Sequence, residues 1–464
     1  MTGDIAFQEI EEQREKLVRL ATDIWNNPEI AYHEDKASTW TAEALKNYGF
    51  EVELGAYGIP TAIRAQWGSG HPVIGFLGEY DALEGLSQQL KPEKAPIEGQ
   101  KYGHGCGHNI LGVGHLAAAI GMKKEMEKRN IQGTVVFYGC PAEEVGTGKG
   151  LMAMRGAFKE LDVAMAYHPG WFNYVFTGGK NGAHRVQADF YGRSSHSGSS
   201  PQNGRSALLA ARMAELAVTM IHDQLPPGSK IGSAVADGHF SPGQIPAHAT
   251  VNFSMKAATV QEMDQLYERL KKVLEGVAMA TETTVEYKRM GGCSPLLNNR
   301  VLADVAYDAM THAPREPWSP EEIEFARRLN ETTPGPYQTK LAEAGAKGTD
   351  MQILDGVLPL RVFDTNGCTD VGDVSQVVPT IFFKICCYNL GTNGHTWQAT
   401  ACAGSSIGMK GMIFAAKTLA LAGLKVMENP EIVAKAKEEF DRETGGRPYV
   451  PSLPEDYDIF ADQY

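Results

Sequence analysis

Hydrophobic and polar residues follow two different periodicities along the first part of the chain. Residues 8–27 carry apolar side chains at helical spacing, and a second helix is expected over about 109–128. The apolar run Val73–Leu77 is short enough for a buried strand. Further strands are expected at 134–139, 162–170 and 380–385. This alternation predicts an α/β fold with a mixed, largely parallel sheet and helices on both faces.

The pattern changes near residue 186. Strand, helix, strand, strand, helix and strand are expected in turn at 186–192, 204–225, 230–239, 248–257, 259–281 and 283–290. This β-α-β-β-α-β order is typical of a ferredoxin-like α+β unit. The α/β pattern then resumes, with a long helix over about 405–427. We therefore predict a larger domain made of 1–185 and 293–464, interrupted by an inserted domain at 186–292.

Composition and charge narrow the class of protein. The 464 residues are enough for two domains, and a net charge of -13 offers no basic surface for nucleic acid. No apolar run approaches the roughly 20 residues of a membrane span, and the N-terminus has no signal pattern. The seven cysteines are odd in number and scattered, which favours reduced thiols. We expect a cytoplasmic protein with neither nucleic-acid nor membrane partners.

Four polar clusters follow predicted strands. They are Glu79 with Asp81, Glu143 with Glu144, His168, and His395. The carboxyl ends of strands in an open α/β sheet border the crevice where ligands bind. These clusters can therefore meet in space.

The stretch YGHGCGHNILGVG, residues 102–114, holds two histidines and a cysteine within five residues, just before a predicted helix. In a glycine-rich loop, Cys106 and His108 can turn to the same side, while His104 frames the loop. With Glu144, His168 and His395 they make a ligand set suited to zinc, manganese or another divalent ion. The alternative is a flexible turn with solvated histidines.

The adjacent Glu143 and Glu144 can divide two tasks if the chain turns after Pro141. One carboxylate would bind metal while the other faces substrate. A metal ion lowers the pKa of a water ligand towards roughly 7, and a nearby carboxylate can take that proton and give it to a leaving amine. This is hydrolytic chemistry. The alternative for the Glu143–Glu144 pair is that both side chains are solvated at the end of a loop.

Two other motifs are weaker. Ser194 to Ser197, with His196 among them, suggest a serine hydrolase, but no G-x-S-x-G motif surrounds them. The stretch GTGKG, residues 146–150, resembles a phosphate loop but lacks the Ser or Thr after Lys149. Neither motif outweighs the metal site.

Several ordered motifs resemble one family. They include LGEYDALEGLSQQ, GHGCGHNILG, VVFYGCPAEEVGTGK, CTDVGDVS and HTWQATACAGSSIGMKGM. Together they resemble the metal-dependent amidohydrolases and carboxypeptidases that include aminoacylase, hippurate hydrolase and plant auxin-conjugate hydrolases. The resemblance runs nearly end to end and implies a zinc-peptidase-like catalytic domain at 1–185 and 293–464, with a dimerisation or lid domain at 186–292.

The resemblance also implies roles for individual residues. Two divalent metal ions per subunit, zinc or manganese, would be held by Cys106, His108, Glu144, His168 and His395, with Cys106 as the bridging ligand. Glu143 would be the general base and acid, and Asp81 would orient a ligand. His196 would reach into the partner's active site and stabilise the oxyanion. A homodimer is expected, with a heteromer containing a related subunit as the alternative.

Two positions depart from the family pattern. Gly243 replaces the usual Asn, and Lys256 replaces an Arg, which can grip a carboxylate in a bidentate way. Both positions are implied to hold the acidic end of the substrate, so they bear on specificity. The predicted function is hydrolysis of the amide bond in N-acylated amino acids or related small amides, such as p-aminobenzoyl-glutamate-like compounds. The alternatives are a carboxypeptidase or dipeptidase of the same family, and a catalytically silent metal-binding regulatory protein.

Overall fold

The computed structural model describes residues 2–237, 241–360, 362 and 367–459. Seven strands form the main sheet: β1 (Glu51–Leu54), β2 (Ile63–Ser69), β3 (Val73–Glu79), β6 (Gly133–Cys140), β7 (Val163–Gly170), β8 (Tyr174–Val175) and β15 (Thr380–Cys386). Their order is β1-β2-β6-β3-β7-β15-β8. The central strands β6, β3, β7 and β15 run parallel, while the outer pairings are antiparallel. The predicted mixed, largely parallel sheet is confirmed.

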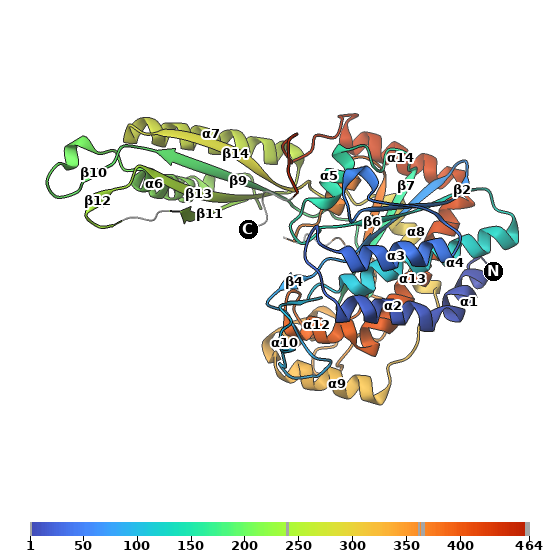
Figure 1. Cartoon of the computed structure of the whole chain (residues 1–464). Helices are drawn as coiled ribbons and strands as arrows, with labels where there is room; N and C mark the ends of the chain where they lie inside the picture. The colour runs from blue at the N-terminus through green and yellow to red at the C-terminus, as the bar shows by residue number, and fades with distance from the viewer. Residues whose placement is uncertain (1, 238–240, 361, 363–366, 460–464) are drawn as a thin grey trace.

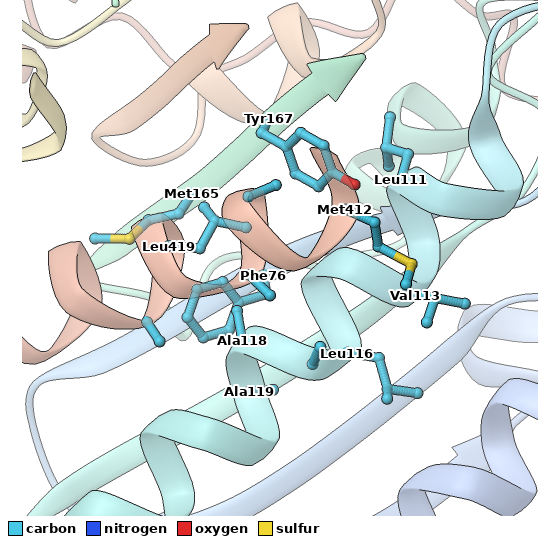
Figure 2. Close-up of a cluster of buried hydrophobic side chains, with 14 of the residues drawn as sticks. Phe76, Leu111, Val113, Leu116, Ala118, Ala119, Met165, Tyr167, Met412 and Leu419 are labelled. Carbon is cyan, nitrogen blue, oxygen red and sulfur yellow. The ribbon is translucent and has the colours of Figure 1, made fainter. Parts of the chain in front are cut away.

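Helices cover both faces of this sheet because buried side chains alternate along its strands. Phe76 of β3 packs on one face with α4 (His108–Arg129) and α13 (Ser406–Met427), and Figure 2 shows part of this core. The next residue, Leu77, packs on the other face with α5 (Gly148–Met154). The remaining elements are α1 (Asp4–Glu12), α2 (Arg14–Asn26), α3 (Asp35–Asn47), η1 (Ala56–Gly58), β4 (Leu83–Glu84), β5 (Tyr102–Gly103), α8 (Arg300–His312), α9 (Pro320–Glu331), α10 (Pro334–Glu343), α11 (Val371–Ser375), α12 (Trp397–Gly404) and α14 (Pro430–Thr444).

Two expectations about helices were wrong. The single helix predicted over 8–27 is two helices, α1 and α2, which meet at Gln13 with φ -94° and ψ 0°. The bend keeps both Ile10 and Leu17 in the core, and no Gly or Pro marks it in the sequence. In addition, α13 is long and apolar enough to cross a membrane, although no such run was expected. Since 94% of its apolar window is buried inside the protein, α13 is built like the core helix of a globular domain.

The second sheet has four antiparallel strands, β9 (Gly182–Tyr191), β11 (Lys230–Asp237), β13 (His248–Ala257) and β14 (Thr284–Cys293). Their order is β11-β13-β9-β14, and α6 (Ala207–Met220) and α7 (Val260–Thr281) pack against one face. The predicted ferredoxin-like order is therefore present. Short elements fill its loops: β10 (Ser195–His196), η2 (Pro201–Asn203), η3 (His222–Gln224) and β12 (Gln244–Ile245). Residues 238–239, expected in a strand, lie outside the described residues.

The second sheet projects to one side of the larger part, with β10 and β12 at its far end (Figure 1). The second sheet joins the main body where β9 begins, at Gly182, and where β14 ends, at Cys293. The domain boundaries at 185/186 and 292/293 remain a prediction.

Candidate metal centre and active site

The predicted ligands gather at the carboxyl edge of the parallel strands. Glu144 follows β6, His168 lies near the end of β7, and His395 lies in the loop after β15. Cys106 lies in the short loop between β5 and α4, but His108 is the first residue of α4 rather than part of that loop. Gly107, with φ 77°, is the N-cap that turns the chain between these two residues.

Short distances connect all five predicted ligands. Cys106 Sγ lies 3.2 Å from His168 Nε2, and His395 Nε2 lies 3.3 Å from Glu144 Oε2. The donor atoms form overlapping groups, each within 4.8 Å: Cys106, His108 and His168; Cys106, Glu144 and His395; Glu79, His108 and Glu143. Cys106 and His108 each belong to two of the groups. The two groups that share Cys106 contain all five predicted ligands, which is the arrangement expected of a ligand between two ions.

Asp81 fixes the orientation of His108. His108 Nδ1 donates to Asp81 Oδ1 at 2.8 Å, so that Nε2 faces the other donors. The second carboxylate oxygen, Asp81 Oδ2, accepts from the backbone N–H of Glu144 at 2.8 Å. One buried carboxylate thus orients two predicted ligands, as outer groups of metal sites commonly do.

The residues fit a divalent metal. Glu79 Oε2, His108 Nε2 and Glu144 Oε1 are buried, and each lacks a hydrogen-bond partner among the described residues. Burying such atoms without partners costs free energy, and all three face one another across the same space. A thiolate, imidazoles and carboxylates are a donor set that zinc or manganese accepts.

The electrostatics of the site call for added positive charge. Burial raises the pKa of Glu144 well above its ordinary value and raises that of Glu79 as well. Burial also raises the pKa of the Cys106 thiol to about 12, with Glu144 as a second cause. Dications reverse this trend by stabilising the deprotonated ligands, so metal binding would release protons.

Two buried carboxylates beside the site, Glu79 and Asp370, were given no role in it from the sequence. Glu79 ends β3, and its Oε2 lies 3.3 Å from His108 Nε2. Its other oxygen, Oε1, accepts from Lys149 Nζ at 2.6 Å, and Lys149 Nζ also reaches Asp370 Oδ1 at 2.6 Å. Because Lys149 is fully buried between two carboxylates, GTGKG is not an open phosphate loop. Glu79 was visible as a strand-end carboxylate, but nothing in the sequence connected it with residue 370.

A cavity of about 440 Å³ opens beside the ligands at the junction of the two sheets. Cys106, Glu143, Glu144, His168 and His395 line it together with the cations Lys180, Arg185, Lys256 and Lys384. Lys180 and Lys384 were not among the site residues predicted from the sequence. The only sign of their role was the presence of a charged residue, Lys384, within the apolar run TIFFKI.

His196 lies far from this cavity in its own chain. It is exposed in β10, which pairs with β12 at the distal end of the second sheet (Figure 1). Ser195 Oγ donates to the carbonyl of Ser200 at 2.6 Å, and His196 Nδ1 accepts from backbone N–H groups. The described hydrogen bonds therefore contain no Ser195–His196 pair of the kind a serine hydrolase needs.

Within one chain, the structure places the two positions implied to hold the acidic end of the substrate far apart. Gly243 lies beside the His196 loop, where its carbonyl accepts from Ser197 N at 2.9 Å. Lys256 lines the cavity. Strand β13 runs between them, and its residues from His248 to Lys256 span about 26 Å at the usual rise of a strand. Within one chain, only Lys256 can contact a substrate in this cavity.

Comparison with known proteins agrees with this geometry. Residues 179–282 match the M20 peptidase dimerisation domain. The chain is 34% identical over 461 residues to one of the subunits of p-aminobenzoyl-glutamate hydrolase from Escherichia coli, and the match covers 96% of each sequence. The chain belongs to the M20 family of metal-dependent amidohydrolases and peptidases. The resemblance expected from the motifs is thereby confirmed.

Two further relatives of this M20 chain show the breadth of the family. The chain is 30% identical to the human Xaa-Arg dipeptidase, covering 93% of this chain and 90% of the relative. The solved structure of a dinuclear metal-binding M20 peptidase from Bacillus subtilis has a TM-score of 0.60 at 15% identity, covering 90% of this chain and 99% of that one. This second likeness supports the fold. The chain thus has the fold of an M20 protein and belongs to a family of amidohydrolases and peptidases.

Proposed function

We propose that the protein uses two divalent metal ions per subunit, zinc or manganese, to hydrolyse the amide bond of N-acylated amino acids or related small amides. Compounds like p-aminobenzoyl-glutamate are the first candidates, because that substrate is named in the relative at 34% identity. The main support is the convergence of a thiol, three imidazoles and a carboxylate from separate segments at one edge of the main sheet, next to the cavity.

Cys106, His108, Glu144, His168 and His395 would hold the ions, with Cys106 placed to contact both. Ions bound there would polarise the amide carbonyl and lower the pKa of water. Asp81 keeps His108 oriented, and it also holds the backbone of Glu144. The ligands are therefore preorganised by hydrogen bonds before any metal arrives.

Glu143 is the proposed general base and acid. It lines the cavity, and its Oε2 lies 3.8 Å from His108 Nε2. From that position its carboxylate can take a proton from the attacking water and return it to the nitrogen of the leaving amine. Both transfers need a carboxylate that is open to the cavity, and Glu144 is more deeply buried than Glu143.

We further propose a homodimer in which His196 of one subunit stabilises the oxyanion in the other. The outer face of α6 supports a dimer, because it exposes Leu209, Met213, Leu216 and Met220 at helical spacing. Strand β11 is also an edge strand of the second sheet among the described residues. A heteromer is the alternative, since the Escherichia coli relative is itself named as one subunit of its hydrolase. The seven free cysteines support a reducing compartment such as the cytoplasm.

The role of Glu143 can be tested by substitution. Glu143→Ala should lower kcat on p-aminobenzoyl-glutamate or the best substrate of an N-acyl amino acid panel by at least about 100-fold. Metal analysis should still find two ions per subunit, whereas Glu144→Ala should lose metal. Glu438→Ala, at an exposed position of α14, serves as the control and should match the wild type. Retained hydrolysis in Glu143→Ala would contradict the assignment.

Dipeptides should be included in the same panel, because the human relative is named a dipeptidase. Faster cleavage of dipeptides than of N-acyl amino acids would favour that alternative. Metal binding without hydrolysis of any panel member would favour the catalytically silent alternative.

A further inference from the structure

One wall of the cavity carries positive charge that the proposed metal ligands do not explain. Lys180 Nζ lies 5.0 Å from the centre of the Phe382 ring, and Lys384 Nζ lies 5.3 Å from the same centre. All three residues line the cavity. Cation–π contacts of this length hold ammonium groups in place without adding a counter-charge.

The fold aims this pair of lysines at the metal ligands. Lys384 in β15 is the register partner of His168 in β7, and paired residues on neighbouring strands present their side chains to the same face. Phe382 is two residues earlier and shares that face. Its ring centre lies 6.2 Å from that of His168. The two lysines therefore lie next to the site where the amide would be cleaved.

Neither lysine has a carboxylate within 4.0 Å among the described residues, whereas Lys149 behind the site has two. Lys180 is almost fully buried. An anion bound in the cavity would stabilise these two poorly solvated ammonium groups on its wall.

We propose that Lys180 and Lys384 bind a carboxylate of the substrate, so that the enzyme selects amides of acidic amino acids and rejects those of basic ones. This inference rests on the proposed amide hydrolysis and narrows its substrate class. The two curated relatives are named for opposite chemistries, one for a glutamate amide and one for Xaa-Arg dipeptides. The lysine pair favours the acidic class, since an arginine side chain would meet two like charges.

The test uses one acyl group, p-aminobenzoyl, on glutamate, glutamine, isoglutamine and arginine. Glutamine neutralises the side-chain carboxylate and isoglutamine the α-carboxylate, so the panel shows which of the two is bound. In the wild type, kcat/KM for the glutamine compound should be at least about tenfold below that for the glutamate compound, and the arginine compound should be poorer still. A loss with isoglutamine alone would overturn the selection of acidic amino acids. In Lys180→Met/Lys384→Met, the kcat/KM values for the glutamate and glutamine compounds should come within about threefold of each other.

Lys272→Met, at an exposed position of α7, is the matched control and should keep the wild-type preference. A wild type that cleaves glutamate, glutamine and isoglutamine amides equally would overturn the proposal. A double variant with the wild-type preference would overturn it as well.

Calorimetry on metal-free protein separates this proposal from the proposed function. p-Aminobenzoyl-glutamate should bind the metal-free wild type and should bind the double lysine variant at least about tenfold more weakly. Binding without hydrolysis by the metal-loaded wild type would leave the carboxylate site standing and remove the proposed function. Hydrolysis by the metal-loaded wild type, together with equal binding of the ligand to the metal-free wild type and the double lysine variant, would leave the proposed function standing and remove the carboxylate site.

Discussion

At the scale of single residues, the site depends on buried carboxylates held by specific donors. Asp81 is fully buried, and burial alone would raise the pKa of its carboxyl. The hydrogen-bonded His108 outweighs that effect, so the pKa of Asp81 is lowered. Asp81 therefore stays ionised and keeps both His108 and Glu144 in place.

Asp373 is the opposite case and gives a prediction for stability. It is buried in α11 and accepts from Ser294 Oγ at 2.7 Å and Tyr449 Oη at 2.9 Å. Burial raises its pKa from 3.8 to about 6. Because the native carboxyl keeps its proton to higher pH than the unfolded one, the free energy of unfolding contributed by this group falls as pH rises from 3.8 to about 6.

The measurement compares urea unfolding of metal-free wild type and Asp373→Asn from pH 3.5 to 7. The stability of the wild type relative to the variant should fall by up to about 3 kcal/mol across that window and stay level above it. Asn cannot ionise, so it provides the reference. A difference that rises with pH would show that the carboxylate form is the one the fold stabilises.

At the scale of elements, Glu144 and His395 lie on turns with unusual backbone conformations. Ala142, just before the two glutamates, has φ 58°, and His395 also has φ 58°. Glu34 Oε1 accepts from the Ala142 N–H at 2.8 Å and so holds the first of these turns. Such conformations cost about 1–3 kcal/mol each and persist where the surroundings impose them.

Gly107 allows a test of how strongly the α4 cap positions Cys106 and His108. It has φ 77°, and an added Cβ would lie 2.6 Å from Tyr388 Oη. Gly107→Ala should therefore lower the free energy of unfolding by about 1–3 kcal/mol and weaken metal binding by about tenfold or more. Chemical denaturation and metal titration would measure the two effects.

Gly99→Ala is the matched control, because Gly99 has φ 78° but nothing within 4 Å of an added Cβ. Gly99→Ala should lower the free energy of unfolding only through its strained backbone conformation, and it should keep the metal affinity of the wild type. Equal behaviour of the two variants would mean that the cap does not position the ligands.

Much of the fold could be predicted because its strands and helices have different apolar periodicities. The central strands and the ferredoxin-like order follow directly from that pattern. The break at Gln13 could not be predicted, since it depends on how Ile10 and Leu17 reach one core. In the site, Glu144, His168 and His395 were found because each comes at or after the end of a predicted strand, and Cys106 and His108 because they lie in a glycine-rich stretch before a predicted helix. Lys180 and Lys384 meet only through the packing around Phe382.

At the scale of the whole molecule, the second sheet carries His196 away from the cavity of its own chain (Figure 1). A catalytic role for His196 therefore requires a second subunit. His196→Ala should lower kcat by about 100-fold or more with metal content intact. Mixing it with Glu143→Ala should restore part of the activity, because a hybrid dimer has one site with both residues native.

Purification through a different affinity tag on each variant would isolate the hybrid, and each variant mixed with itself is the control. Absence of complementation in a proven hybrid would rule out catalysis across the interface.

The central claim is that amide hydrolysis depends on metals held by the Cys106 and His108 site. The most direct measurement follows p-aminobenzoate release from p-aminobenzoyl-glutamate, or amine release from the best substrate of the panel, while a chelator removes the metals and zinc or manganese is added back. We predict that activity disappears on chelation and returns in proportion to bound metal, up to two ions per subunit. Hydrolysis that survives complete metal removal would contradict the account.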